Sequence, residues 1–171
     1  ATQSRMQQPP VLRLVYKQFA QQVDDIGFHR TGSTNIWTEG EGSSSADSVV
    51  ATWVTASMMP LLQVPPLLGR PFNADEEIRG GPDAVILSES EWRTRFSAAN
   101  DIIGKTLIVN SVPRQIVGVM PERFSFPTAQ TRVWLPVKVI DNPGVGEFYY
   151  SGVARLARGV SAQQAQRELA A

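Results

Sequence analysis

The sequence contains no cysteine and only one histidine, His29, among its 171 residues. The absence of cysteine excludes disulfide bonds, thiolate metal sites and thiol catalysis. A single histidine excludes zinc sites that are built from several imidazoles. Neither sign of charge is in excess, since 16 basic residues balance 16 acidic ones. The usual electrostatic reason to expect nucleic acid as a partner is therefore missing.

Long apolar runs are also absent. No stretch reaches the roughly eighteen apolar residues that a membrane-spanning helix needs. Nothing resembles a signal peptide, and the chain begins at Ala1 rather than at methionine, so we expect a segment cut from a longer protein. Apolar residues make up 42% and charged residues 19%, which indicates a globular chain with a real core.

Hydrophobic spacing predicts an α+β fold with a mixed sheet and helices on one side. An amphipathic helix is expected at residues 11–23, a middle helix begins after residue 88, and a closing helix is expected at residues 161–171. Four prolines limit residues 58–72 to one short helical turn. One or two short strands are expected around Phe28 and Ile36, and the other strands at residues 48–57, 83–88, 105–110, 114–120, 132–137 and 148–157.

Three polar residues stand where helices are expected to begin. Asn73, Ser88 and Ser161 are each followed three residues later by Glu or Gln, the spacing of a capping box. We predict that each caps a helix, and that loss of one cap costs about 1 kcal/mol.

The stretch at residues 67–77 carries an arginine between glycine and proline and then three consecutive acids. We interpret Asp75, Glu76 and Glu77 as the first turn of a short helix, where the positive end of the backbone dipole favours acids. Arg70 is expected to pair with a neighbouring acid or carbonyl. A calcium or magnesium site is the alternative, but the alternating oxygen-ligand loop of such sites is missing.

The search for catalytic residues finds none. A serine hydrolase needs a base near its nucleophile, and His29 is expected to be a half-exposed strand residue. Ser88 follows a buried strand but is explained as a cap, and no phosphate-binding glycine loop occurs. We therefore assign no catalytic, cofactor-binding or metal-binding residues and expect no cofactor. The tryptophans are expected in the core rather than on a ligand platform: Trp37, Trp53, Trp92 and Trp134.

Several stretches between residues 48 and 171 resemble, in order, the MacB-like periplasmic core domain of FtsX-like ABC-transporter permeases, including the duplicated orphan permeases. The residues that carry the resemblance are Gly69, Arg70, Pro71, Phe72, Gly104, Gly118 and Pro121. Two positions depart from the pattern. Gln63 stands where glycine is usual, and Asn110-Ser111 replaces Asn-Gly between two strands, which loses the residue that adopts positive φ most easily. A hairpin with the link at 111–113 is expected here.

The resemblance implies a domain on the periplasmic side of the bacterial inner membrane, with membrane spans before Ala1 and after Ala171 in the parent protein. It implies a porter-like lobe formed by residues 1–60 and 145–171. A second α/β lobe, residues 61–144, is inserted between these parts. The family supplies no catalytic residues in this domain.

The function that the resemblance implies is that of a non-enzymatic module, which couples membrane-domain motion to the export or extraction of a substrate. The expected partners are the rest of the permease, a second copy, a separate ATPase and an extracytoplasmic protein, but no nucleic acid. The isolated chain is expected to be monomeric. A stand-alone extracytoplasmic binding module or small hydrolase with the same fold is the alternative, and membrane spans encoded on either side would decide against it.

Overall fold

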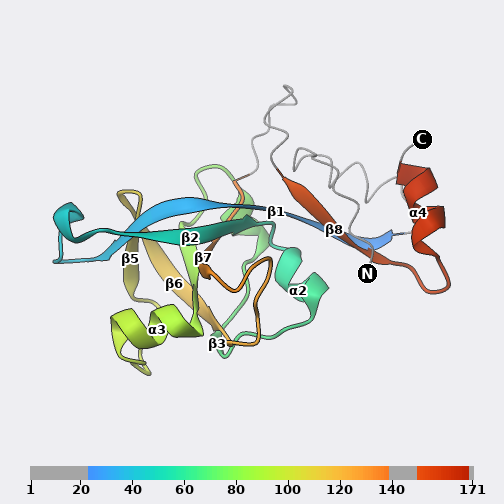
Figure 1. The fold of residues 1–171 in the computed structure, drawn as a ribbon. Helices are drawn as coiled ribbons and strands as arrows, with labels where there is room; N and C mark the ends of the chain where they lie inside the picture. Colours follow the sequence, from blue (N-terminus) through green and yellow to red (C-terminus); the bar gives the residue numbers. More distant parts are fainter. Residues whose placement is uncertain (1–22, 139–149, 170–171) are drawn as a thin grey trace.

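The computed structural model describes residues 23–138 and 150–169 (Figure 1). The helix that we predicted at residues 11–23 lies almost wholly outside this part. The strands are β1 (Val23–Thr38), β2 (Asp47–Val54), β3 (Leu68–Gly69), β4 (Ala84–Ser88), β5 (Thr106–Val109), β6 (Val112–Met120), β7 (Thr131–Pro136) and β8 (Ser151–Leu156). The helices are α2 (Met58–Leu62), α3 (Glu89–Phe96) and α4 (Ala162–Leu169), with 3-10 turns η1 (Ser43–Ser45) and η2 (Ala74–Glu77).

All eight strands belong to one mixed sheet, as predicted, and six of them close into a ring. The order β2-β7-β4-β6-β5-β1 returns to its start because β1 also pairs with β2. The β2–β7 and β4–β6 pairs are parallel, whereas the other pairs in the ring are antiparallel. Two strands lie outside the ring. β3 pairs with the end of β6, and β8 pairs with β1.

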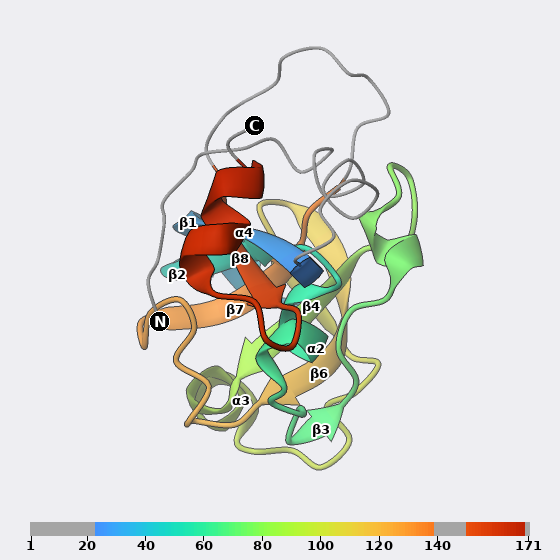
Figure 2. The same cartoon turned by 90° about the vertical axis from the view of Figure 1, so that its right-hand side faces the viewer.

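β1 is a single strand of 16 residues, and not the one or two short strands that we expected around Phe28 and Ile36. Its first part pairs with β8, its middle with β2 and its last three residues with β5. One neighbouring strand or another pairs with it from Val23 to Thr38, so the glycines within it do not end the strand. β8 and α4 therefore lie at the end of β1 opposite to the β1–β2 turn, and Figure 2 views the molecule from that end.

The β5–β6 hairpin is present, but its link is shorter than expected. The turn consists of Asn110 and Ser111, with φ of 47° and 66°, so both residues adopt the left-handed conformation without glycine. Pro113 lies inside β6 opposite Ile108, where β4 has not yet begun to pair on the other side. The strand therefore needs no amide donor at Pro113. Gln63, at the other departure from the family pattern, likewise has a φ of 57° and ends α2.

Two hydrophobic clusters form the core, one on each face of β4. This strand is wholly apolar and buried from Ala84 to Leu87, as predicted for residues 83–88. Val85 and Leu87 belong to the first cluster and Ala84 and Ile86 to the second. The first cluster fills the ring and contains Ile36, Ala51, Trp92, Ile102, Leu107, Val109, Ile116, Val119, Val133 and Leu135. The second contains Val54, Met58, Met59, Phe72, Val117, Met120, Phe124 and Trp134.

Thr34 of β1 is 3% exposed, and its Oγ1 has no hydrogen-bond partner in the described part of the chain. An unsatisfied buried hydroxyl costs free energy that an isosteric methyl group does not. We therefore expect Thr34→Val to raise the free energy of unfolding by about 1 kcal/mol in urea melts. Thr52→Val is the matched control and should lower it, because Thr52 Oγ1 lies 2.9 Å from Thr131 Oγ1.

Candidate functional site

The acidic stretch at residues 73–77 is a structural element built around a buried carboxylate. Asn73 Oδ1 accepts a hydrogen bond from the Glu76 amide (3.2 Å), and Glu76 Oε2 accepts one from the Asn73 amide (2.9 Å). Arg70 donates to both Glu76 oxygens at 2.7 and 3.2 Å. Glu76 is only 1% exposed, and Glu77 is also buried and accepts from the Ala56 amide at 2.8 Å. Glu76 and Glu77 are therefore occupied within the fold, whereas Asp75 is exposed.

Gly69 and Gly118, two residues of the family pattern, allow β3 to lie against β6. Gly69 has a φ of +72°, and a Cβ on it would lie 2.1 Å from the carbonyl oxygen of Val117. A Cβ on Gly118 would lie 2.6 Å from the carbonyl oxygen of Arg70. The two glycines face one another in the ladder, so neither position has room for a side chain.

The other family-pattern residues lie apart from one another. Gly104 has a φ of +92° and its amide donates to the carbonyl of Ile116 at 2.8 Å, which fixes the turn before β5. Phe72 is buried in the second cluster. Pro121 is buried too and follows the end of β6, where it lines the groove described below. At the closing helix, Ser161 Oγ accepts from the Gln164 amide at 3.3 Å.

His29 lies on β1, half-buried, with its ring edge-on to Phe126 at 4.7 Å between centroids. Its Nδ1 is buried and has no hydrogen-bond partner among the described residues. Burial lowers the pKa of the His29 imidazole, since the charged form loses hydration. In the described chain, no group of three or more Asp, Glu, His or Cys side chains could hold a metal.

His29 should make the fold sensitive to mild acid. Its pKa in the folded state lies below the ordinary value of 6.5, so the unfolded state binds the proton more readily. The contribution is fully present above pH 6.5 and is lost as the pH falls toward the folded pKa. We expect the free energy of unfolding to fall by at most about 1.4 kcal/mol per pH unit from this group. Urea melts between pH 7.5 and 5 should show a smaller fall for His29→Gln than for the natural sequence.

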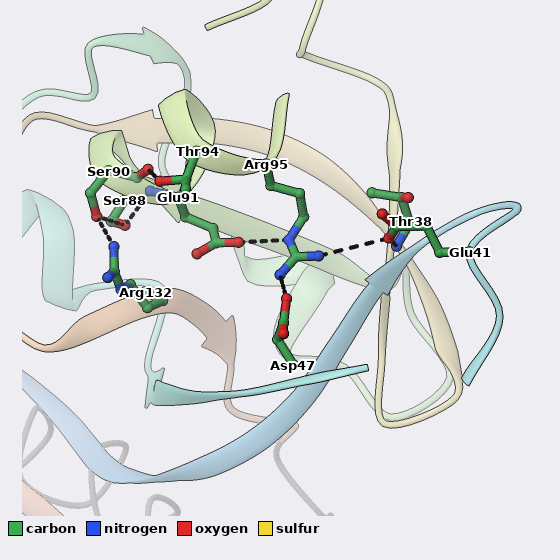
Figure 3. Close-up of polar contacts among 9 residues, drawn as sticks. All are labelled: Thr38, Glu41, Asp47, Ser88, Ser90, Glu91, Thr94, Arg95 and Arg132. Carbon is green, nitrogen blue, oxygen red and sulfur yellow. Dashed lines mark hydrogen bonds and ion pairs between the residues drawn. The ribbon is translucent and has the colours of Figure 1, made fainter. Parts of the chain in front are cut away.

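A groove of about 1000 Å³ lies between α3 and the beginnings of β2 and β7. The loop that joins β6 to β7 forms its remaining wall. α3 is positioned by its cap, because Ser88 Oγ accepts from the Glu91 amide at 3.1 Å. Glu91 does not return this bond to Ser88 but points along the helix to Arg95 (Figure 3).

Arg95 connects α3 to the β1–β2 turn at one end of the groove (Figure 3). It donates to Glu91 Oε1 at 2.7 Å and to Asp47 Oδ2 at 2.6 Å, and it lies 3.8 Å from Glu41 Oε2. Glu41 is held in turn by the Thr38 amide at 2.8 Å. Burial alone would lower the pKa of the Arg95 guanidinium, but its hydrogen bonds to Asp47 and Glu91 outweigh burial and raise the pKa. Arg95 therefore stays charged.

The other end of the groove is held by α3 and the 121–130 loop. Arg132 of β7 donates to Ser90 Oγ, as Figure 3 shows. Glu89 Oε2 accepts from the Glu122 amide at 3.0 Å, and Glu89 Oε1 accepts from Arg93 at 2.7 Å. The hydrogen bond from Arg93 is the main cause that lowers the pKa of the Glu89 carboxyl. These contacts hold the walls of the groove in place, and the first residues of β2 line the groove between them.

The arrangement presents charged and hydrogen-bonding side chains to a ligand. The groove is lined by carboxylates, hydroxyls and two guanidiniums, and the single histidine of the chain is not among its residues. Sequence reasoning did not single out this groove. The spacing of Glu91 and Arg95 could have suggested one ion pair on a helix. Nothing local could have indicated that Asp47 joins them.

Comparison with known proteins identifies the family. The family model of the MacB-like periplasmic core domain matches residues 4–171. The chain therefore belongs to this family of periplasmic domains from ABC-transporter permeases of the MacB and FtsX-like type. Two similar curated relatives are the macrolide export ATP-binding/permease proteins MacB of Escherichia coli K12 and Shigella flexneri. Each is 27% identical over 104 residues, which is 59% of this chain but only 16% of the relative.

Solved structures show the same fold. The periplasmic region of MacB from Actinobacillus actinomycetemcomitans has a TM-score of 0.69 at 16% identity, with coverage of 98% of this chain and 72% of that one. A domain of a putative permease protein from Porphyromonas gingivalis has a TM-score of 0.72 at 17% identity, with coverage of 98% and 76%. The extracellular domain of the noncanonic ABC-type transporter YknZ has a TM-score of 0.59 at 13% identity, with coverage of 87% and 72%.

Proposed function

We propose that this chain is a non-enzymatic coupling module of an export or extraction permease. It transmits motion of the membrane domain, driven by an ATPase in the cytoplasm, to a substrate on the periplasmic side. The observation that carries the proposal is the family match over residues 4–171. The relatives named as export ATP-binding/permease proteins support it, although the chain spans only 16% of their length.

The shape of the sheet suits a module that moves as a body. β1 passes without interruption from the β8 pairing into the closed ring, so a force applied at one end is carried along a single hydrogen-bonded strand. We retain the proposal of a porter-like lobe at residues 1–60 and 145–171 with residues 61–144 inserted. No helix in residues 23–138 or 150–169 is long and apolar enough to cross a membrane. We also propose that the parent protein has membrane spans and lies in the inner membrane.

These 171 residues contain no cysteine, so one cysteine introduced here can test the coupling role in a full-length permease from which any other cysteines have been removed. Ser44 in η1 is exposed. A membrane-impermeant maleimide should therefore label Ser44→Cys in intact spheroplasts if the domain is periplasmic. A fluorophore at this site in the reconstituted permease should change its emission when ATP is hydrolysed. A hydrolysis-deficient ATPase partner is the control. Unchanged emission during ATP turnover would end the coupling proposal.

The proposal also excludes activity of the domain itself. We expect no binding of ATP to the isolated chain by calorimetry at micromolar concentrations, because the sequence has no phosphate-binding loop. We also expect a monomer in sedimentation equilibrium. Membrane spans that hold two copies together supply an effective concentration of about a millimolar, so weak contacts between the domains suffice. A dimer that survives dilution to nanomolar concentration would contradict this expectation.

A further inference from the structure

We propose that the groove beside α3 binds an extended segment of a partner polypeptide. This segment adds as a strand to the open edge of β2 and carries lysine or arginine side chains. The inference goes beyond the coupling role, since the groove can bind such a segment whether or not the domain moves. It rests on the direction of the backbone groups at Ser48, on the point where β7 begins, and on the charge of the groove.

The main-chain groups of Ser48 point away from β1. Ser48 stands opposite Asn35 in the antiparallel β1–β2 ladder. The Asn35 amide donates to Asn110 Oδ1 (3.0 Å), and its carbonyl accepts from the Asn110 amide (2.9 Å), so both groups lie on the β5 side. In an antiparallel ladder, residues directly opposite each other either bond one another or both turn away. The N–H and C=O of Ser48 therefore face the other side of β2.

The far end of β2 supports this direction. Val54 lies six residues after Ser48 and so has the same orientation in the strand. Its carbonyl accepts from the Val137 amide at 2.9 Å, on the side of β7. The same alternation therefore places the free groups of Ser48 on the edge that lines the groove.

This edge has no strand beside it in the described part of the chain. β7 begins its pairing with β2 only at Thr131 opposite Val50, so Asp47–Val49 pair with β1 alone. An unpaired edge is a template for the addition of a strand, in which main-chain hydrogen bonds supply affinity and side chains supply specificity. α3 forms the opposite wall of the groove. An added strand would therefore hydrogen-bond to β2 on one side and contact side chains of α3 on the other.

The charge of the groove favours a basic segment. Five carboxylates and two guanidiniums line it: Glu41, Asp47, Glu89, Glu91 and Glu122, with Arg95 and Arg132. Arg95 is enclosed by its acids and Arg132 is engaged by Ser90. The Asp47 side chain is still 65% exposed, and Glu122 lies exposed at the rim. The surplus of negative charge is therefore available to lysine or arginine on an incoming strand.

A capped octapeptide that alternates lysine and valine is the probe, titrated against the 171-residue chain by fluorescence anisotropy and amide NMR. We expect Ser48→Pro to weaken binding about tenfold or more, because it removes the free donor. The fold should survive, since this amide does not bond β1 and proline is tolerated at a strand edge. Ser48→Ala keeps the donor and should bind within about twofold of the natural sequence.

Two further arms test the contacts separately. A peptide with N-methyl groups on alternate amides cannot add as a strand and should not bind, a result that does not depend on how Ser48→Pro folds. Glu122→Gln should weaken binding severalfold at low salt, where exposed charges are least screened. Unchanged binding to a folded Ser48→Pro, equal binding of an alternating glutamate–valine peptide, or no binding at millimolar concentration would each overturn the proposal. The coupling role would stand in every case, because the measurement uses no ATP.

Discussion

Gly69→Ala should lower the free energy of unfolding by about 2–4 kcal/mol, because overpacking and positive φ act together. The new Cβ would meet the Val117 carbonyl oxygen at 2.1 Å, and also Gly118 Cα at 3.0 Å. Both are main-chain atoms, so no rotamer change can relieve the contact. β3 would have to leave β6, and with it the start of the segment that places Arg70 over Glu76. Urea melts followed by far-UV circular dichroism measure the loss.

Gly104→Ala is the matched control for this prediction. Gly104 also has a positive φ, of +92°, but the nearest atom to an added Cβ is Gln115 Nε2 at 3.9 Å. Only the conformational cost of about 1 kcal/mol should remain. Equal losses in the two variants would show that the Gly69–Gly118 contact contributes nothing and that positive φ is the whole effect.

The local elements of this fold could be predicted from the sequence because their causes lie within a few residues. Asn73 and Ser88 were predicted as caps from a spacing of three residues, and both accept the expected amide bond. The buried strand β4 was indicated by its run of apolar residues. The conformation of Asn110-Ser111 was less predictable, since the surrounding strands impose a positive φ that neither residue prefers as strongly as glycine.

Long-range pairing explains what could not be predicted. The length of β1 depends on three different neighbours, and the closure of the ring depends on β1 meeting β2 and β5 together. Neither leaves a signal in the spacing of residues along β1 itself. The burial of Glu76 was missed for a different reason, because its partners are close in the sequence. A run of three acids is typical of an exposed helix start, but here the Arg70 guanidinium and the Asn73 amide together satisfy a buried carboxylate.

The groove was the least predictable feature. Arg95 meets an acid four residues before it, which is readable from the sequence, but also Asp47, which is 48 residues away. The open edge at Ser48 is a property of where β7 begins, since a β7 that started two residues earlier would close it. Binding sites of this kind arise from the ends of strands rather than from motifs, so the absence of a catalytic motif says little about them.

Trp92→Ala should cost about 3–5 kcal/mol of unfolding free energy, the range of large aromatic truncations in cores. Trp92 is 7% exposed and lies in the cluster that fills the ring, together with Leu87 at the staple position before α3. Its Nε1 donates to the carbonyl of Ala99 at 3.0 Å, which closes the turn after α3. Removal of the ring leaves a cavity beneath the helix that forms one wall of the groove.

Trp92→Phe separates the two contributions. It retains most of the buried ring but loses the Nε1 donor, so the Ala99 carbonyl gives up one hydrogen bond at a net cost of about 1 kcal/mol. Denaturant melts should therefore give Trp92→Ala a much lower free energy of unfolding than Trp92→Phe. Arg93→Ala, on the exposed side of the same helix, loses the ion pair with Glu89 and a cation–π contact at 5.8 Å from the Trp92 ring centroid, and should change stability by about 1 kcal/mol or less. A loss below about 1 kcal/mol for Trp92→Ala would show that the ring does not support α3, because buried aromatic side chains contribute several times that amount.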